Sequence, residues 1–151
     1  MMAVCRQDLS EAAVKDVFVL SYDRMRRYEG AWHMEKGLLF PSYVFLESDN
    51  EELLLEELQN STLTVGQKKI LLPLDRVEEE FLKKLCGESH HLKMSRGVIR
   101  KGSTQIMEGP LKGMESRICR IDRHKRLARV VMMRPGCHTF PAGLEITEKT
   151  L

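Results

Sequence analysis

Cysteines and long apolar runs are scarce in this sequence. The chain of 151 residues contains four cysteines and no CxxC motif, so we expect reduced thiols and not a disulfide-stapled secreted fold. No stretch approaches the roughly 20 uncharged apolar residues that a membrane-spanning helix requires. The start of the chain lacks a charged segment followed by an apolar signal core, which argues against export. These absences favour a cytoplasmic protein that does not contact a membrane.

Motifs of the common enzyme classes are also missing. The sequence has no GxSxG elbow, HExxH pair, Walker loop or GxGxxG turn, and its Cys and His residues suggest no arrangement of nucleophile and base. Cys86, His90 and His91 could complete a metal site only with Cys137 and His138, at no recognised zinc spacing. We therefore expect no catalytic residue, no metal and no cofactor.

Charge is divided unevenly along the chain, although its net value is only +2. Residues 1–91 carry 11 Lys and Arg against 17 Asp and Glu, whereas residues 92–151 carry 13 against 5. Such asymmetry hints at a nucleic-acid partner for the basic part. The length of 151 residues allows one domain or two small ones, and hydrophobic residues make up 42%, enough for a core.

The acidic part predicts an α+β domain over residues 1–87. Hydrophobic patterns indicate four segments before residue 47: a short helix over 8–14, a strand over 17–20, a long hairpin or loop over 22–37, and a strand over 38–46. Pro41 places the last of these at a sheet edge or at a bulge.

Two further helices are predicted from their capping signals. Asp49 and Glu52 have the spacing of a capping box, and Asp75 and Glu78 repeat it. Gly87 is placed to end the second helix. The apolar positions of that helix recur at helical spacing: Val77, Phe81, Leu82 and Leu85.

The basic part predicts a small β-barrel over residues 98–151, after a linker over 88–97. Three strand-like runs, 103–107, 116–121 and 127–133, are separated by turns rich in Gly and Pro. We found no internal repeat.

Basic residues gather on the last two of these strands and the turn between them. The cluster consists of Arg117, Arg120, Arg123, His124, Lys125, Arg126 and Arg129. A hairpin would bring them around one tip, where they could neutralise phosphates or present guanidinium groups to bases. The alternative is an ordinary solvated turn.

Aromatic residues concentrate between residues 28 and 45: Tyr28, Trp32, Phe40, Tyr43 and Phe45. They could form an apolar docking surface, or they could be core, because one face of an alternating strand must be buried. The residues alone favour core for most of them.

Two segments carry a resemblance to a known family. Gly109-Pro110-Leu111-Lys112-Gly113 resembles a KOW motif, in which the first glycine and the proline form a turn and the second glycine permits close packing. The segment 39–46, LFPSYVFL, resembles the FPGYV strand of the NusG N-terminal domain. Both occur in the order and separation of the NusG family of transcription factors, and segments 22–35 and 121–126 are most similar to its LoaP branch.

The resemblance implies a fold and a function. The fold would be a NusG N-terminal α/β domain followed by an SH3-like KOW β-barrel. The protein would bind bacterial RNA polymerase together with other elongation factors, recognise a hairpin in nascent RNA, and suppress pausing and termination in long operons. Phe40, Pro41 and Tyr43 match positions that dock on the polymerase clamp helices, and the KOW barrel would bind RNA through the basic cluster.

The sequence departs from the family pattern at three places. The usual opening strand of WYV type is missing, so we expect an N-terminal sheet that lacks one strand. Ser42 replaces a glycine, and residues 134–137 replace the usual turn. Two alternative functions remain: a general NusG-like factor whose barrel binds a ribosomal or termination protein, and a standalone RNA-binding protein of ribosomal type.

Overall fold

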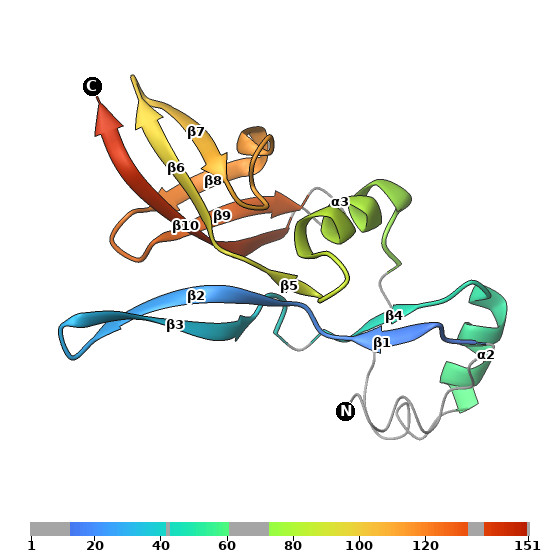
Figure 1. Cartoon of the computed structure of the whole chain (residues 1–151). Helices are drawn as coiled ribbons and strands as arrows, with labels where there is room; N and C mark the ends of the chain where they lie inside the picture. The colour runs from blue at the N-terminus through green and yellow to red at the C-terminus, as the bar shows by residue number, and fades with distance from the viewer. Residues whose placement is uncertain (1–12, 42, 61–72, 133–137, 151) are drawn as a thin grey trace. The chain divides into compact units, whose positions relative to one another are not determined.

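The computed structural model describes residues 13–41, 43–60, 73–132 and 138–150, and the fold is α+β with more strand than helix (Figure 1). The strands are β1 (Asp16–Phe18), β2 (Ser21–Tyr28), β3 (Ala31–Leu38), β4 (Phe45–Glu47), β5 (His91–Leu92), β6 (Ser95–Arg100), β7 (Ser103–Glu108), β8 (Ile118–Asp122), β9 (Leu127–Met132) and β10 (His138–Thr150). The helices are α2 (Glu51–Asn60), α3 (Arg76–Cys86) and the 3₁₀ turn η2 (Glu115–Arg117). Neither described α-helix is long and apolar enough to cross a membrane.

The chain divides into two compact units whose boundaries differ from the predicted domains. The first unit comprises Met1–Val19 and Ser42–Leu72, and the second comprises Leu20–Pro41 and Pro73–Leu151. The segment 20–41 joins the second unit because β2 pairs in parallel with β5, Ser21 lying opposite His91. Helix α3 joins it because the buried ring of Phe81 packs against Phe140 of β10, with the ring centroids 6.3 Å apart.

The first unit is built on a two-stranded antiparallel sheet, β1 with β4, and helix α2. Its core contains four buried apolar residues: Ala13, Val14, Val17 and Leu54. The rings of Phe18 and Phe45 stack across the strands at 5.6 Å. The predicted strand over 17–20 corresponds to β1, and most of the predicted helix over 8–14 lies outside the described residues.

The start of α2 differs by one residue from its prediction. The side chain of Asn50, and not that of Asp49, accepts the backbone N–H of Leu53 at 3.1 Å. Asn and Asp cap helices about equally well, so residue type alone does not distinguish these two adjacent positions.

The single strand predicted over 38–46 is wrong. Strand β3 ends at Leu38 and β4 begins at Phe45, and the two strands belong to different sheets. Pro41 lies between them and has no backbone N–H to donate to a strand ladder.

Residues 22–37 were predicted to form a long hairpin or a loop, and the structure shows the hairpin, made of β2 and β3. All eight residues of β2 pair antiparallel with β3. Glu29 and Gly30 form the two-residue turn with φ angles of 53° and 75°. Two positive φ angles are typical of the type I′ turn, whose twist suits antiparallel strands.

The second unit contains two sheets. One has three strands in the order β3-β2-β5, and the other has five strands in the order β7-β6-β10-β9-β8. Strand β10 pairs antiparallel with β9 through its first half and parallel with β6 through its second half, and Figure 1 shows it as the long red strand shared by both. The predicted strands correspond to β7, β8 and β9.

The predicted linker over 88–97 instead contains β5 and the first residues of β6. Leu92 and Ser95 are fully buried there. The prediction failed because this segment is polar and contains Gly97, so it has none of the apolar alternation that marks a strand.

Both ends of α3 agree with the prediction. Asp75 accepts the backbone N–H of Glu78 at 2.9 Å, and Gly87, at φ 66°, ends the helix. Of the four apolar residues that recur at helical spacing, Val77 is 65% exposed, whereas Phe81, Leu82 and Leu85 are buried.

The KOW-like turn also differs in detail. Gly109 has φ 102°, and a Cβ there would lie 2.6 Å from the Cα of Ser95. Gly113 has φ 84° and open space around its Cα. The close approach therefore belongs to the first glycine and not, as predicted, to the second. Ser95 completes the turn by accepting the backbone N–H of Leu111 at 3.1 Å.

Candidate nucleic-acid interface

The β8–β9 hairpin carries the predicted basic cluster. Residues 123–126 form the turn between the two strands. Asp122 stabilises that turn by accepting the backbone N–H of Lys125 at 3.1 Å, and Arg126 adopts a positive φ of 53°. The side chains of Arg123, His124 and Lys125 are exposed on this turn.

A groove of about 770 Å³ lies against this hairpin. Its walls come from β2, β3, β8, the turn and β10, and its lining residues are Arg27, Trp32, Arg120, Ile121, Asp122, Arg123, His124, Arg126, Glu145, Ile146 and Lys149. Four predicted residues therefore line one groove: Arg120, Arg123, His124 and Arg126. Sequence reasoning missed Arg27, Trp32 and Lys149, because no local pattern links them to the hairpin.

The groove is positively charged. Five Arg and Lys side chains line it against two carboxylates. Both carboxylates already have partners, since Asp122 caps the turn and Glu145 lies 3.7 Å from Arg126 and 3.4 Å from Arg96. Four lining cations form no ion pair with any described residue: Arg27, Arg120, Arg123 and Lys149. Such a surface attracts polyanions.

Trp32 and Arg126 join the β2–β3 hairpin to the five-stranded sheet. The guanidinium of Arg126 lies over the indole ring at 4.2 Å, a cation–π contact. Strand β10 passes close to β2, because a Cβ at Gly143 would lie 2.6 Å from the carbonyl oxygen of Asp23. Glycine at this position lets the two sheets approach and so positions one wall of the groove.

Arg117, which was predicted to belong to the basic cluster, does not line the groove. Its guanidinium donates to both carboxylate oxygens of Glu78 at 3.0 and 3.2 Å and lies over the ring of Phe81 at 3.9 Å. The side chain of Glu78 is 3% exposed and that of Arg117 is 24% exposed. Arg117 therefore holds α3 against the sheet.

Lys125 and Arg129 are exposed but do not line the groove. Arg129 lies directly opposite Arg120 across the β8–β9 pair. Like charges in such positions repel, so a bound anion would relieve the repulsion between them.

The three residues predicted to contact RNA polymerase have different surroundings. The ring of Phe40 packs against Phe140 at 5.4 Å and is half-buried. Pro41 is exposed. Tyr43 is 48% exposed and belongs to the first unit, whereas Phe40 belongs to the second. Tyr43 and Pro41 are thus accessible to a partner, and Phe40 contributes to internal packing.

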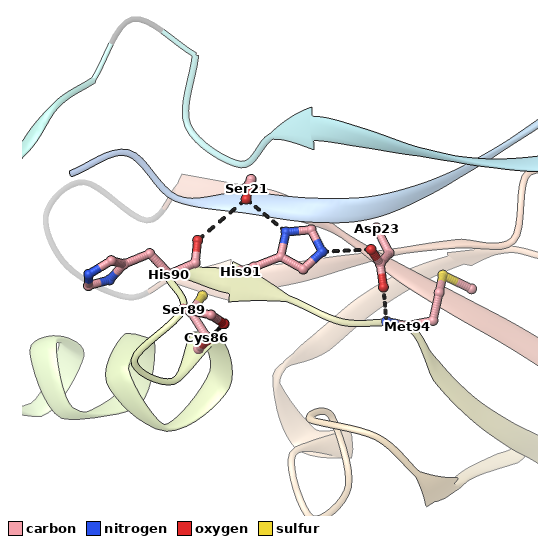
Figure 2. A network of polar contacts seen from close by, with 7 residues as sticks. All are labelled: Ser21, Asp23, Cys86, Ser89, His90, His91 and Met94. Carbon is pink, nitrogen blue, oxygen red and sulfur yellow. Dashed lines mark hydrogen bonds and ion pairs between the residues drawn. The ribbon is translucent and has the colours of Figure 1, made fainter. Parts of the chain in front are cut away.

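Figure 2 shows a polar network between β2 and β5 that was not predicted. His91 contacts the hydroxyl of Ser21 at 2.7 Å through Nδ1 and the carboxylate of Asp23 at 2.6 Å through Nε2. Asp23 also accepts the backbone N–H of Met94 at 3.0 Å.

Ser21, His91 and Asp23 are the residue types of a hydrolytic triad, but their burial and contacts indicate a structural role. Ser21 is 6% exposed, and its hydroxyl also reaches the carbonyl oxygen of His90. A nucleophile must be accessible to substrate, so this network instead fixes β5 beside β2.

Cys86, which the sequence analysis considered as a metal ligand, is buried in the core. Cys86 is 4% exposed, and burial raises the pKa of its thiol to about 12. Since metals bind thiolates, this cysteine is a poor ligand at neutral pH. In the part of the chain that the structure describes, no three His, Cys, Asp or Glu side chains are grouped to hold a metal ion. Cys137 lies outside that part.

No protein-family model matches the chain, and comparison with curated proteins gives no match. The NusG resemblance therefore remains a prediction that rests on the residues and motifs of this sequence.

Proposed function

We propose that this chain is a transcription elongation and antitermination factor of the NusG family, of the LoaP type. It would bind RNA polymerase and a hairpin in the nascent RNA, and so promote readthrough of long operons. Once such a protein has bound polymerase, its RNA-binding surface stays close to the transcript, so the effective concentration for RNA binding rises.

The observation that carries the proposal is the cationic groove. It gathers Arg120, Arg123, His124 and Arg126, and four of its five Arg and Lys side chains form no ion pair with a residue in the described part of the chain. Guanidinium groups suit phosphate oxygens and unpaired bases, which are the parts of an RNA hairpin that a protein can reach. The five-stranded sheet that carries the groove also contains the 109–113 turn, and we assign it as the KOW barrel.

Salt-dependent RNA binding tests the groove. Fluorescence anisotropy with a labelled stem-loop RNA should give an affinity that falls steeply as salt rises. The double variant Arg120→Ala/Arg123→Ala should bind more weakly, and its slope of log affinity against log salt should fall by about 1 per residue removed. Lys112→Ala is the matched control, because Lys112 is exposed on the same unit but outside the groove. Equal slopes for the double variant and the control would refute the RNA assignment.

The polymerase contact is assigned to Tyr43, the exposed aromatic residue of the first unit. Tyr43→Ala should reduce capture of the chain on immobilised RNA polymerase and leave RNA affinity unchanged. Leu55→Ala is its control, since Leu55 is also an exposed apolar residue of that unit. If Tyr43→Ala and Leu55→Ala are captured equally well, the docking assignment is wrong.

A further inference from the structure

The β2–β3 hairpin supplies two side chains to the cationic groove. Arg27 and Trp32 lie directly opposite each other across the two strands, so both project from the same face of the hairpin. Both line the groove together with Arg120 and Arg123, which come from the β8–β9 hairpin almost a hundred residues later in the chain. The groove is therefore composite and cannot be a property of the β8–β9 hairpin alone.

The aromatic face of Trp32 distinguishes this groove from a plain phosphate-binding surface. Trp32 is only half-buried, and the planar guanidinium of Arg126 stacks on its ring at 4.2 Å. The side chain of Arg126 is itself 27% exposed, and its guanidinium forms an ion pair with Glu145 at 3.7 Å. Paired bases inside a duplex cannot reach such a stack, whereas an unpaired base can stack on an aromatic ring or on a guanidinium plane.

We propose that the Trp32–Arg126 pair is a stacking site for an unpaired RNA base, with Arg27 binding the adjacent phosphate. This inference rests on the proposed RNA-binding function and deepens it. It assigns the β2–β3 hairpin to the RNA interface and gives the groove a preference for looped RNA over continuous duplex. The cations at the other end of the groove bind the flanking backbone.

The emission of Trp32 reports stacking directly, because it is the only tryptophan in the chain and can be excited selectively over the three tyrosines. Titration of the full chain with a stem-loop RNA should quench this emission in step with the anisotropy signal. A blunt duplex with the same stem should bind through charge and leave the emission unchanged. Absence of quenching at saturating stem-loop, or equal quenching by the duplex, would overturn the proposal.

Variants provide an independent measurement. Trp32→Ala should weaken stem-loop binding at least about fivefold, the lower bound for one stacked base, whereas Trp32→Phe keeps an aromatic face and should retain most of the affinity. If Trp32→Ala binds the stem-loop as tightly as the wild type, stacking is excluded.

Arg27→Ala should lower the salt slope by about 1. Arg24→Ala is the matched control, because Arg24 is exposed on the same strand and an odd number of residues away, so it lies on the opposite face. Equal binding by these two variants, while Arg123→Ala still weakens binding, would exclude Arg27 from the site and leave the RNA function intact; the same result together with unchanged binding by Trp32→Ala would exclude the whole hairpin. If no RNA binds the wild-type chain, the proposed function itself fails.

Discussion

Removal of Arg117 should destabilise the second unit and not act on RNA binding directly. Arg117 is the charged partner of Glu78, whose side chain is 3% exposed. Arg117→Ala leaves that carboxylate buried without its counter-ion, and breaking a buried pair in this way costs about 3–5 kcal/mol. Arg117 is itself 24% exposed, so water can partly replace its guanidinium, and we expect a loss of about 3 kcal/mol. That is a large share of a typical domain stability of about 5–15 kcal/mol.

Urea denaturation followed by circular dichroism measures this loss. Arg120→Ala is the comparison, because it removes the same charge from an exposed position on β8, the strand that follows η2. It should change stability by no more than about 0.5 kcal/mol. Adding Glu78→Gln to Arg117→Ala should recover part of the lost stability, because the uncompensated charge disappears. If Arg117→Ala is as stable as Arg120→Ala, the ion pair does not hold α3 against the sheet.

Three further predictions concern groups outside the groove. Cys86, with its pKa raised to about 12 by burial, should react with iodoacetamide far more slowly than the exposed Cys119 in native protein; equal rates by peptide mass spectrometry would contradict its burial. Hydrogen bonds to the carboxylate of Glu115, first from its own backbone N–H and then from neighbouring amides, lower its pKa. The ionised carboxylate therefore stabilises the fold above the ordinary pKa of Glu, and this stabilisation is lost as pH falls through the lowered pKa. Glu115→Gln should be less stable than the wild type at neutral pH and should lose less stability in acid. Parallel pH profiles of the urea midpoint for the two proteins would refute this. Gly109→Ala should lower stability by at least about 1 kcal/mol, because its positive φ disfavours a Cβ; an unchanged midpoint would show that the turn tolerates one.

The sequence predicted those parts of the fold whose signals are local. Asp75 caps α3 through a backbone amide three residues away, and the β8–β9 turn is fixed by Asp122 and Lys125, again three residues apart. Side-chain capping and turn formation act over such short separations, so the sequence around each element was sufficient. The charge density of the β8–β9 hairpin is also a local signal, and four residues of the predicted basic cluster line the groove.

The remaining features depend on contacts between distant segments. Ser21 and His91 are 70 residues apart, and Glu78 and Arg117 are 39 residues apart. Neither pair has a sequence pattern that marks it, so Arg117 was assigned to the surface cluster and β5 to a linker. Trp32 was weighed only as core or docking surface, because nothing near it in sequence reveals the guanidinium of Arg126 over its ring.

Transcription in vitro tests the central claim most directly. With purified RNA polymerase and a template that encodes the bound stem-loop upstream of a terminator, the wild-type chain should raise the fraction of full-length transcript. Disruption of the stem-loop, or the Arg120→Ala/Arg123→Ala substitution, should abolish this increase. Equal readthrough with the wild-type chain, with the double variant and with no added protein would contradict the account.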